Sequence, residues 1–517
     1  MSKDNPNNME KLSAHPVEML PRLWVVTIAL LFFASCILCT NPGLKTRVTQ
    51  KALNYAQSIG MAVLQQKMRK VKIPDVSGKK RVKFIGRIRF SFTGFQITQF
   101  GLPQSSVKFV AGKGIQLSVA NGYIKVRGNF RVKKRHFFRT SGSFEVTASR
   151  LSISQTIGLT RDNTGRPAIH SIACSANVGT VHVKFIKKKR WLYNLFRKFI
   201  EKPIKRALNK EICPQVSSAI KDLENDLKSM KISFRLNNFA EVDYSLVNQI
   251  KFTSNAMDLD FKGEVYRVGH HKEPPFQPPP VSLPSQSNHM LYLGISDFLA
   301  NSAGFVFQKA GALQMKITDH MVPKESPFRL NTKSFGLIMP RLQKLYPNMN
   351  MIMNLKATKP PVLRAANNSI TIQACGALDV LVILPNSSLV SLFVLNIDAS
   401  VSAKVGISGM KLIGSVILNH LKLSLGHSRV GPVPVTGLQL LIKIVIRAVV
   451  LPKVNDKLVG GVPLPTVKHI DFVNPVLTVN QNILVIATDI RYRLGTSSRS
   501  QPKLCEGKEN QTSDYFD

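Results

Sequence analysis

The segment His271–Pro284, HKEPPFQPPPVSLP, divides the chain into two stretches of similar design. Six of these fourteen residues are proline, which fixes φ and lacks a backbone N–H. Neither a helix nor an interior strand is compatible with such a segment. We expect a stiff, extended connector of the polyproline type over residues 271–284.

Two long stretches flank this connector, 41–270 and 285–493, and a polar tail follows at 494–517. Each stretch has the order helix, strands, helix, strands, which predicts an architectural duplication. The apolar spacing predicts helices at Leu44–Met68, from Lys187–Phe199 through Pro203 to about Met230, at Ser296–Lys309 and at Thr436–Leu451. Lys443 and Arg447 interrupt the last apolar run, which favours a buried amphipathic helix over a membrane span.

The strands are predicted from alternating residues. Arg81–Thr93 alternates apolar with cationic residues, so it predicts one strand with an apolar face and a cationic face. Asn121-Gly122, within Leu117–Val126, predicts a hairpin turn. Further strands are expected at Phe144–Ile153, Val178–Ile186, Val242–Tyr266, Met290–Ile295, Leu389–Val405, Leu421–Leu425 and Lys468–Tyr492.

Charge is the strongest functional signal. The chain has 71 Lys and Arg against 29 Asp and Glu, a net charge of +42, while its 44% hydrophobic content argues for a folded protein. Such an excess requires a polyanionic partner: nucleic acid, an anionic membrane or a phosphorylated glycolipid. Between Asn41 and Lys272 there are 44 cations and 13 acids, against 27 and 16 elsewhere. The anion-binding surface therefore belongs mainly to the first half.

Two segments of this half combine cations with aromatic rings, Arg127–Arg139 and Lys187–Phe199. Rings at the headgroup level and cations near phosphates suit an anionic lipid surface. The alternative is a solvated strand end and a helix start whose aromatics are core. Leu192, Leu195, Phe196 and Phe199 have the spacing for that second interpretation.

The amino terminus indicates secretion. Leu23–Cys39 is an apolar run after Arg22, which predicts that residues 1–40 are a signal peptide with a polar extension. A membrane-anchoring helix is the alternative. Sequons at Asn367, Asn386 and Asn510 agree with an extracellular, glycosylated protein.

Four cysteines remain after this segment: Cys174, Cys213, Cys375 and Cys505. None forms a CxxC pair, which argues against a zinc site. Cys174 and Cys213, both in the basic half, are the natural candidate disulfide, although four cysteines permit three pairings.

No catalytic motif of useful specificity occurs. The chain lacks G-x-S-x-G, H-E-x-x-H, a P-loop and a D-x-D-x-D-G calcium loop. Gly112-Lys113-Gly114 is interpreted as a turn, and His270-His271 as an incidental pair. We therefore expect no enzyme, no metal and no cofactor.

Five segments closely resemble the family of bactericidal/permeability-increasing and lipopolysaccharide-binding proteins, with the basic first half nearer to the bactericidal members. They are NPGLKTRVTQKALNYA (Asn41–Ala56), KIPDVSG (Lys72–Gly78), MLYLGISDFLANSAGFVFQKAG (Met290–Gly311), ESPFRLNTKSF (Glu325–Phe335) and VLPKVNDKLVGGVPLP (Val450–Pro465). The resemblance is collinear from Asn41 to Tyr492. It implies an α+β fold, an elongated boomerang of two pseudo-symmetric barrels. Each barrel would be a curled antiparallel sheet with two helices, and a central antiparallel sheet would join them.

The resemblance also implies a Cys174–Cys213 disulfide, an apolar phospholipid pocket in each half, and lipid A binding at the cationic tip of the first half. The tip residues would be Lys79, Lys80, Arg81, Lys83, Arg127, Arg131, Lys133, Lys134, Arg135 and Arg139. The aromatics Phe130, Phe137 and Phe138 would contact the membrane. The pocket candidates are Val48, Ala52, Tyr55, Ile59, Val63, Leu441, Val445 and Ala448.

These features predict a secreted innate-defence protein that binds lipopolysaccharide, phospholipid and anionic bacterial membrane, as a monomer or weak dimer. An extracellular phospholipid-transfer protein of the same fold is the alternative. A nucleic-acid-binding protein would explain the charge but not the signal peptide or the sequons. Cys375 and Cys505 depart from the family pattern and leave open a second disulfide or an intermolecular one.

Overall fold

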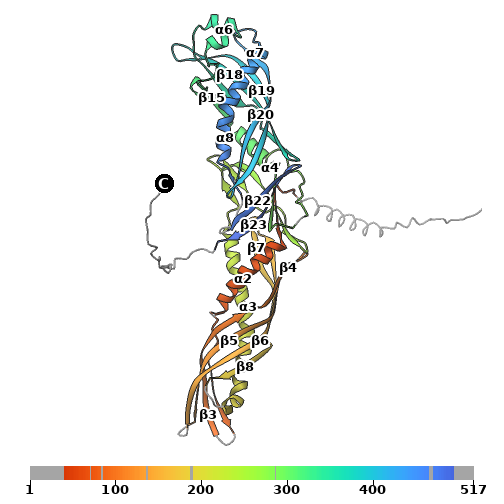
Figure 1. Cartoon of the computed structure of the whole chain (residues 1–517), viewed down its shortest axis with the longest axis vertical. Helices are drawn as coiled ribbons and strands as arrows, with labels where there is room; N and C mark the ends of the chain where they lie inside the picture. The colour runs from red at the N-terminus through yellow and green to blue at the C-terminus, as the bar shows by residue number, and fades with distance from the viewer. Residues whose placement is uncertain are drawn as a thin grey trace, which may run out of the picture.

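The computed structural model describes residues 40–69, 71–82, 86–134, 138–186, 190–285, 287–464 and 470–493, with backbone only at 82, 138 and 190–199. Residues 1–39 of the predicted signal peptide, Lys83, Arg135, Phe137, Cys505 and Asn510 lie outside these residues, as does the side chain of Phe138. The molecule is long, with a sheet-rich half at each end (Figure 1). This α+β architecture of two sheet-rich halves confirms the predicted fold, with curled sheets that do not close into barrels.

The N-terminal half is built on a seven-stranded antiparallel sheet, whose strands all pair with sequence neighbours or near neighbours. The order is β2 (Val76–Val82), β3 (Gly86–Gly101), β5 (Gly114–Lys134), β6 (Phe138–Arg161) and β7 (Pro167–Asn177), with β4 (Gln104–Val110) on β5 and β8 (Thr180–Phe185) on β6. Alternate residues of β3 face inward: Ile88, Phe90 and Phe92 are buried. Their neighbours Arg87 and Arg89 are exposed, as alternation predicts.

Two helices cover the inner face of this sheet. In α3 (Arg190–Lys228), every fourth residue from Ile200 to Ile220 is buried. Residues four apart lie on the same face of a helix, so they form one apolar stripe that packs against the sheet. The stripe consists of Ile200, Ile204, Leu208, Ile212, Val216 and Ile220. α2 (Gln50–Arg69) adds Leu64 and Met68 to the same core. A disulfide joins Cys174 of β7 to Cys213 of α3, and α3 continues past both Pro203 and Pro214.

A central sheet joins the halves. Its order is β11 (Lys251–Phe252), β12 (Ala256–Phe261), β1 (Leu44–Thr49), β14 (Leu291–Ser296), β23 (Ile483–Tyr492) and β22 (Ile470–Asn480). Three of these strands come from each side of the proline segment, and β1 pairs with β14 at the junction. A separate three-stranded sheet consists of β9 (Ser233–Arg235), β10 (Ala240–Asp243) and β13 (Glu264–Arg267). These strands precede the proline segment in the chain.

The C-terminal half repeats the design with a second seven-stranded sheet. The order is β15 (Gln314–Ile317), β16 (Met351–Ala357), β18 (Ser369–Ile383), β19 (Leu389–Ser408), β20 (Lys411–Ser428) and β21 (Val462–Pro463), with β17 (Val362–Ala366) on β18. Its first helix, α4 (Asp297–Lys309), starts at an N-cap on Ser296. A 3-10 turn (Asp319–Met321) and the short helices α5 (Thr332–Gly336) and α6 (Pro340–Leu345) follow β15.

The last helix of this half runs over Val435–Val459 as α7 (Val435–Val445), a π-helical turn (Ile446–Val450) and α8 (Leu451–Val459). By length and composition it is apolar enough to cross a membrane. One face is nevertheless core: Leu438, Leu441, Ile442 and Val445 are buried against the sheet. Packing in this fold therefore matches the predicted buried amphipathic helix, which extends further than the expected Thr436–Leu451.

The proline segment has neither helix nor strand, and it is held at several points. Phe276 packs edge-on against Phe298 and Phe305 of α4, with ring centroids 5.8 and 6.3 Å away. The Asn41 side chain donates a hydrogen bond to the Pro278 carbonyl at 3.1 Å, and Arg47 donates one to the Pro284 carbonyl at 2.9 Å. The segment is therefore a fixed strap across the junction.

Ion pairs reinforce this junction. Glu264 is 1% exposed, and its carboxylate lies 2.9 Å from Lys262 Nζ. Lys262 also contacts Glu273 of the strap at 3.0 Å. Burial alone would lower the pKa of Lys262, but its hydrogen bonds to the two carboxylates outweigh that effect and raise the pKa. Lys51 of α2 bonds Asp489 of β23 at 2.8 Å and so connects a helix of the first half with a strand of the second.

Three local predictions were wrong. Leu44–Thr49 is strand β1 and not the start of a helix, because it pairs with β12 on one side and β14 on the other. Arg81–Thr93 is not one strand: β2 ends at Val82 and β3 begins at Gly86. Asn121-Gly122 is a bulge within β5 and not a hairpin turn, with Asn121 at a φ of 54° and the register against β6 shifted on both sides of Gly122.

Candidate functional site

Four cations lie opposite one another across four neighbouring strands of the N-terminal sheet. Lys79 of β2 pairs with Arg89 of β3, and Arg89 pairs with Lys133 of β5. Lys133 in turn pairs with Arg139 of β6. All four side chains are exposed. Because adjacent strands are about 4.8 Å apart, this row extends for about 14 Å across the outer face of the sheet.

Further cations surround the row. Arg81 lies opposite Arg87 at the ends of β2 and β3. Arg131 lies two residues before Lys133 on β5, between Ser91 and Ser141 of the neighbouring strands. We define the N-terminal cationic face as Lys79, Arg81, Arg87, Arg89, Arg131, Lys133 and Arg139, all of them exposed. It lies toward the free end of this half, where β3 reaches its tip (Figure 1).

The inner face of the same strands explains why the cations point outward. Phe90, Phe92 and Phe144 are buried and pack against one another, Phe92 and Phe144 with centroids 5.7 Å apart. Val132 is fully buried between Arg131 and Lys133. Since side chains alternate across a strand, burying these residues forces their charged neighbours into solvent.

The cationic face is not neutralised by the protein. Within the described ranges, no salt bridge of 4.0 Å or less involves Lys79, Arg89, Lys133 or Arg139. Residues 76–186 contain 19 Lys and Arg and only two acids, Glu145 and Asp162. Like charges directly opposite in a sheet are destabilising. The arrangement is therefore unfavourable for the protein alone and is suited to an anionic ligand that screens the repulsion.

The structure brings together five of the ten predicted tip residues: Lys79, Arg81, Arg131, Lys133 and Arg139. Lys80 and Lys134 are half-buried on the opposite parity. Arg127 lies further along β5, opposite Glu145. Lys83 and Arg135 are outside the described residues.

Two members of the cationic face, Arg87 and Arg89, were missing from the predicted site. The alternation of β3 had placed them on a cationic strand face. Only the register of β3 against β2 and β5 shows that they complete the row.

One predicted membrane contact was wrong. Phe130 is 5% exposed and packs edge-on against Phe185, with ring centroids 5.1 Å apart. It is core, because it faces inward on β5 between the exposed Asn129 and Arg131. Phe137 and the side chain of Phe138 lie outside the described residues, so their contact with a membrane stays a prediction.

The predicted pocket residues occupy both halves. Val48 is in β1 and not in a helix. On α2, Ala52 is buried, Tyr55 and Ile59 are half-buried, and Val63 is 41% exposed. In the second half, Leu441 and Val445 are buried and Ala448 is half-buried against the same core. The Tyr55 hydroxyl accepts a hydrogen bond from the Tyr492 backbone N–H at 3.0 Å.

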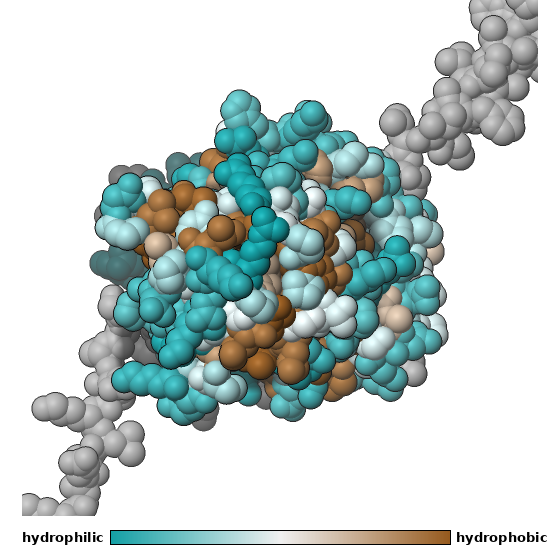
Figure 2. Space-filling view, turned by 90° about the horizontal axis from the view of Figure 1, so that it is seen from above, coloured by the Kyte–Doolittle hydropathy of each residue, from teal (hydrophilic) through white to brown (hydrophobic). Residues whose placement is uncertain are grey.

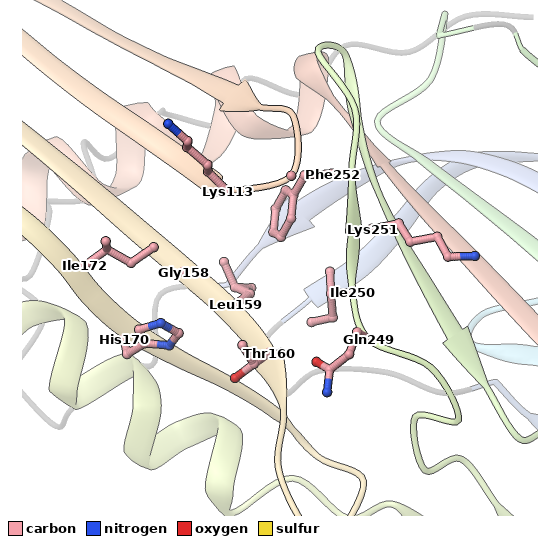
Figure 3. Close-up of a pocket in the computed structure, with 11 residues that line it drawn as sticks. Lys113, Gly158, Leu159, Thr160, His170, Ile172, Gln249, Ile250, Lys251 and Phe252 are labelled. Carbon is pink, nitrogen blue, oxygen red and sulfur yellow. The ribbon is translucent and has the colours of Figure 1, made fainter. Parts of the chain in front are cut away.

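A hollow of about 510 Å³ lies elsewhere, where the N-terminal sheet meets the central sheet (Figure 3). Its wall is lined by Gly112, Lys113, Gly158, Leu159, Thr160, His170, Ile172, Gln249, Ile250, Lys251 and Phe252, so it includes none of the eight predicted pocket residues. Gly112 and Lys113 form a turn with Gly112 at a φ of 67°, as the sequence predicts. Lys251 points away from the hollow and lies 3.9 Å from Asp260.

Other predicted positions are surface features. Asn367 and Asn386 are both exposed, and Asn386 lies in the turn between β18 and β19. Cys375 of β18 is half-buried and has no disulfide partner among the described residues. Over the described part of the chain, no group of three or more His, Cys, Asp or Glu is arranged to hold a metal ion.

Known proteins share both the sequence and the fold. Residues 52–226 match the N-terminal domain of the LBP / BPI / CETP family, and residues 235–492 match its C-terminal domain. The bactericidal permeability-increasing protein of Sebastes schlegelii is 42% identical over 91% of this chain and 98% of its own length. The human lipopolysaccharide-binding protein is 33% identical, over 87% of this chain and 94% of its own.

A crystal structure of lipopolysaccharide binding protein superimposes with a TM-score of 0.64 at 29% identity. The superposition covers 88% of this chain and all of the other. Sequence and fold thus agree from one end of the described chain to the other. The chain belongs to the LBP / BPI / CETP family.

Proposed function

We propose that this protein binds lipopolysaccharide and anionic bacterial membrane through the N-terminal cationic face. The row Lys79, Arg89, Lys133 and Arg139 is the observation that supports this most strongly. Lipid A carries phosphates on a sugar backbone, and a cationic row about 14 Å long can meet more than one of them. Relatives named for lipopolysaccharide binding and for bactericidal action match over almost the whole chain.

The chemistry of capture follows from the side chains. Arginine donates paired N–H groups to phosphate oxygens, and lysine adds a mobile point charge. Each cation near an anionic lipid surface contributes about 1 kcal/mol. These cations would displace the divalent ions that bridge neighbouring lipids. Phe137 and Phe138, which follow Lys133 in the chain, would then enter the acyl layer, and this loosening of the outer membrane would be antibacterial.

We further propose that apolar pockets in each half hold phospholipid, bounded by α2 in the first and by α7 in the second. The partly exposed Ile59 and Val63 of α2 support this, since both are apolar residues that the protein leaves incompletely covered. The protein would bind and not catalyse. Secretion is supported by the apolar Leu23–Cys39, the Cys174–Cys213 disulfide and two exposed sequons.

The test is charge reversal of the row. The variant Lys79→Glu, Arg89→Glu, Lys133→Glu and Arg139→Glu is called the N-face variant. It should lose at least about 1,000-fold in lipopolysaccharide affinity, since four removed cations at about 1 kcal/mol each give roughly that factor and the new carboxylates add repulsion. The matched control reverses four exposed lysines of the second half: Lys356, Lys404, Lys316 and Lys453. Both variants change the net charge equally.

The proposal is tested by titrating wild type, the N-face variant and the control against lipopolysaccharide at several salt concentrations. Wild type and control should bind alike, and their affinity should fall with ionic strength. Equal affinity of the N-face variant and the control would contradict the proposal. If lipopolysaccharide affinity does not change with salt concentration in any variant, the alternative is favoured: a phospholipid-transfer protein that works through its pockets.

A further inference from the structure

The free end of the C-terminal half exposes leucines that the fold leaves uncovered. Leu337 is 87% exposed, Leu440 is 70% exposed and Leu345 is 52% exposed. Leu337 directly follows α5, Leu345 ends α6, and Leu440 lies in α7. We define these three residues as the C-terminal leucine cluster. Scattered surface leucines are ordinary, whereas several on one protruding surface indicate a binding site.

The three elements that carry the leucines are in contact. A Cβ built on Gly437 of α7 would lie 2.8 Å from Ile338, the neighbour of Leu337. Leu440 follows Gly437 by three residues and lies on the same helix face. Arg341 of α6 packs against Gly431, just before α7. The end-on view shows apolar side chains gathered between hydrophilic ones at this end (Figure 2).

The surroundings are cationic. Neither Asn331–Asn350 nor Arg429–Val450 contains an acidic residue. Exposed cations lie next to the leucines along the chain: Lys333, Arg341, Lys344 and Arg429. Protruding apolar side chains beside an excess of positive charge disfavour a cationic partner and favour a negatively charged one.

We propose that this end is a second membrane-contacting surface, which inserts the C-terminal leucine cluster into an anionic phospholipid bilayer. Leucines would enter the boundary between headgroups and acyl chains, while the neighbouring lysines and arginines stay with the phosphates. A bilayer suits this surface better than a protein groove does, because the leucines come from three separate elements on a protruding end. The site is independent of lipopolysaccharide and lies at the opposite end from the N-terminal cationic face (Figure 1).

Vesicle partitioning tests the proposal, in the N-face variant so that the other end contributes little. The probe is a vesicle of phosphatidylcholine and phosphatidylglycerol. Adding Leu337→Ser, Leu345→Ser and Leu440→Ser should lower the partition coefficient by about tenfold per leucine. The control replaces three exposed apolar residues elsewhere, Leu223→Ser, Ile417→Ser and Val476→Ser, which are 48%, 54% and 50% exposed and so comparable with Leu345. It should partition like its parent.

Insertion itself is read from fluorescence. The variant Leu337→Trp should show added emission that shifts to the blue on anionic vesicles and is quenched by brominated lipid, whereas Ile417→Trp should not. Unchanged partitioning of the leucine variant, equal losses in the control, or an unshifted Leu337→Trp emission would each overturn the proposal. Lipopolysaccharide affinity of the otherwise wild-type chain should be unaffected by the leucine substitutions, so failure here is distinguishable from failure of the proposed function.

Discussion

The two seven-stranded sheets share a fold but differ in the charge of their outer faces. In the N-terminal sheet, Lys79, Arg89, Lys133 and Arg139 lie in one row of like charges. In the C-terminal sheet, Asp398 of β19 lies opposite Lys422 of β20, so opposite charges meet. Residues 76–186 hold 19 cations and two acids, and residues 314–428 hold 12 and four. The buried residues on the inner faces therefore determine the fold, while the charges on the outer faces can differ without changing it.

The largest expected difference between the halves concerns the disulfide. Cys174 and Cys213 are 39 residues apart, and opening a loop of that size costs about 4 kcal/mol in the chain-entropy account. Cys174→Ser with Cys213→Ser should lower the unfolding free energy of the N-terminal half by this amount. Urea unfolding followed by hydrogen exchange would measure it. Equal loss of protection in β18–β20 would show that the halves unfold as one unit.

A smaller effect is expected at the junction between the halves. Lys262→Ala leaves Glu264 buried without its nearest cation and should cost about 2 kcal/mol, allowing for the solvent that reaches Lys262. Adding Glu264→Gln should restore part of the loss. Because the pKa of Lys262 is raised on folding, its contribution is complete below its unfolded pKa and is lost as pH rises through the folded one. Thermal melts at neutral and strongly alkaline pH would check both points.

The pair Lys51–Asp489 also joins the halves, but it is more exposed. Desolvation alone would raise the pKa of Asp489, while hydrogen bonds from Lys51 and the Met290 N–H outweigh it and lower the pKa. Asp489→Asn should therefore cost less than about 1 kcal/mol at neutral pH. The stabilisation is present above the unfolded pKa and is lost as pH falls through the lower folded pKa, so the difference between wild type and variant should begin to shrink near pH 4 and close at lower pH. A constant difference down to pH 2 would be evidence against this pair.

The smallest expected effect is the change in stability when one cation is removed from each outer face, and its sign should differ between the two sheets. Arg89→Gln removes one charge from the like-charge row and should stabilise the protein by a few tenths of a kcal/mol at low salt. Lys422→Gln removes the partner of Asp398 and should destabilise by a similar amount. Both effects should shrink in high salt, where charges are screened. Melting curves with the same sign for both variants would refute the contrast between the two faces.

Local patterns predicted much of the fold. The alternation around Ile88 and Phe90 gave the buried and exposed faces of β3, and the spacing of apolar residues gave α4. The errors arose where pairing partners are distant in the chain. Leu44–Thr49 keeps a helical spacing of apolar residues, yet it is a strand because β12 and β14 flank it. The bulge at Asn121-Gly122 has the residues of a turn, and only the register shows that β5 continues.

The candidate site was less predictable than the fold. The density of cations in the sequence identified the end of the molecule where the N-terminal cationic face lies. Which cations face one another depends on register, so Arg87 and Arg89 were missed. Phe130 was misassigned because its neighbours Arg131 and Lys133 are charged, although its own parity places it inside.

Lysine footprinting with and without lipopolysaccharide is the most direct test of the central claim, that the two sheets differ in ligand binding. The full chain is acetylated under both conditions, and labelling is quantified by mass spectrometry. If the N-terminal cationic face binds lipopolysaccharide, Lys79 and Lys133 should lose most of their labelling in its presence, while Lys356, Lys404 and Lys422 keep theirs. Protection confined to the C-terminal lysines, or none at Lys79 and Lys133, would contradict it.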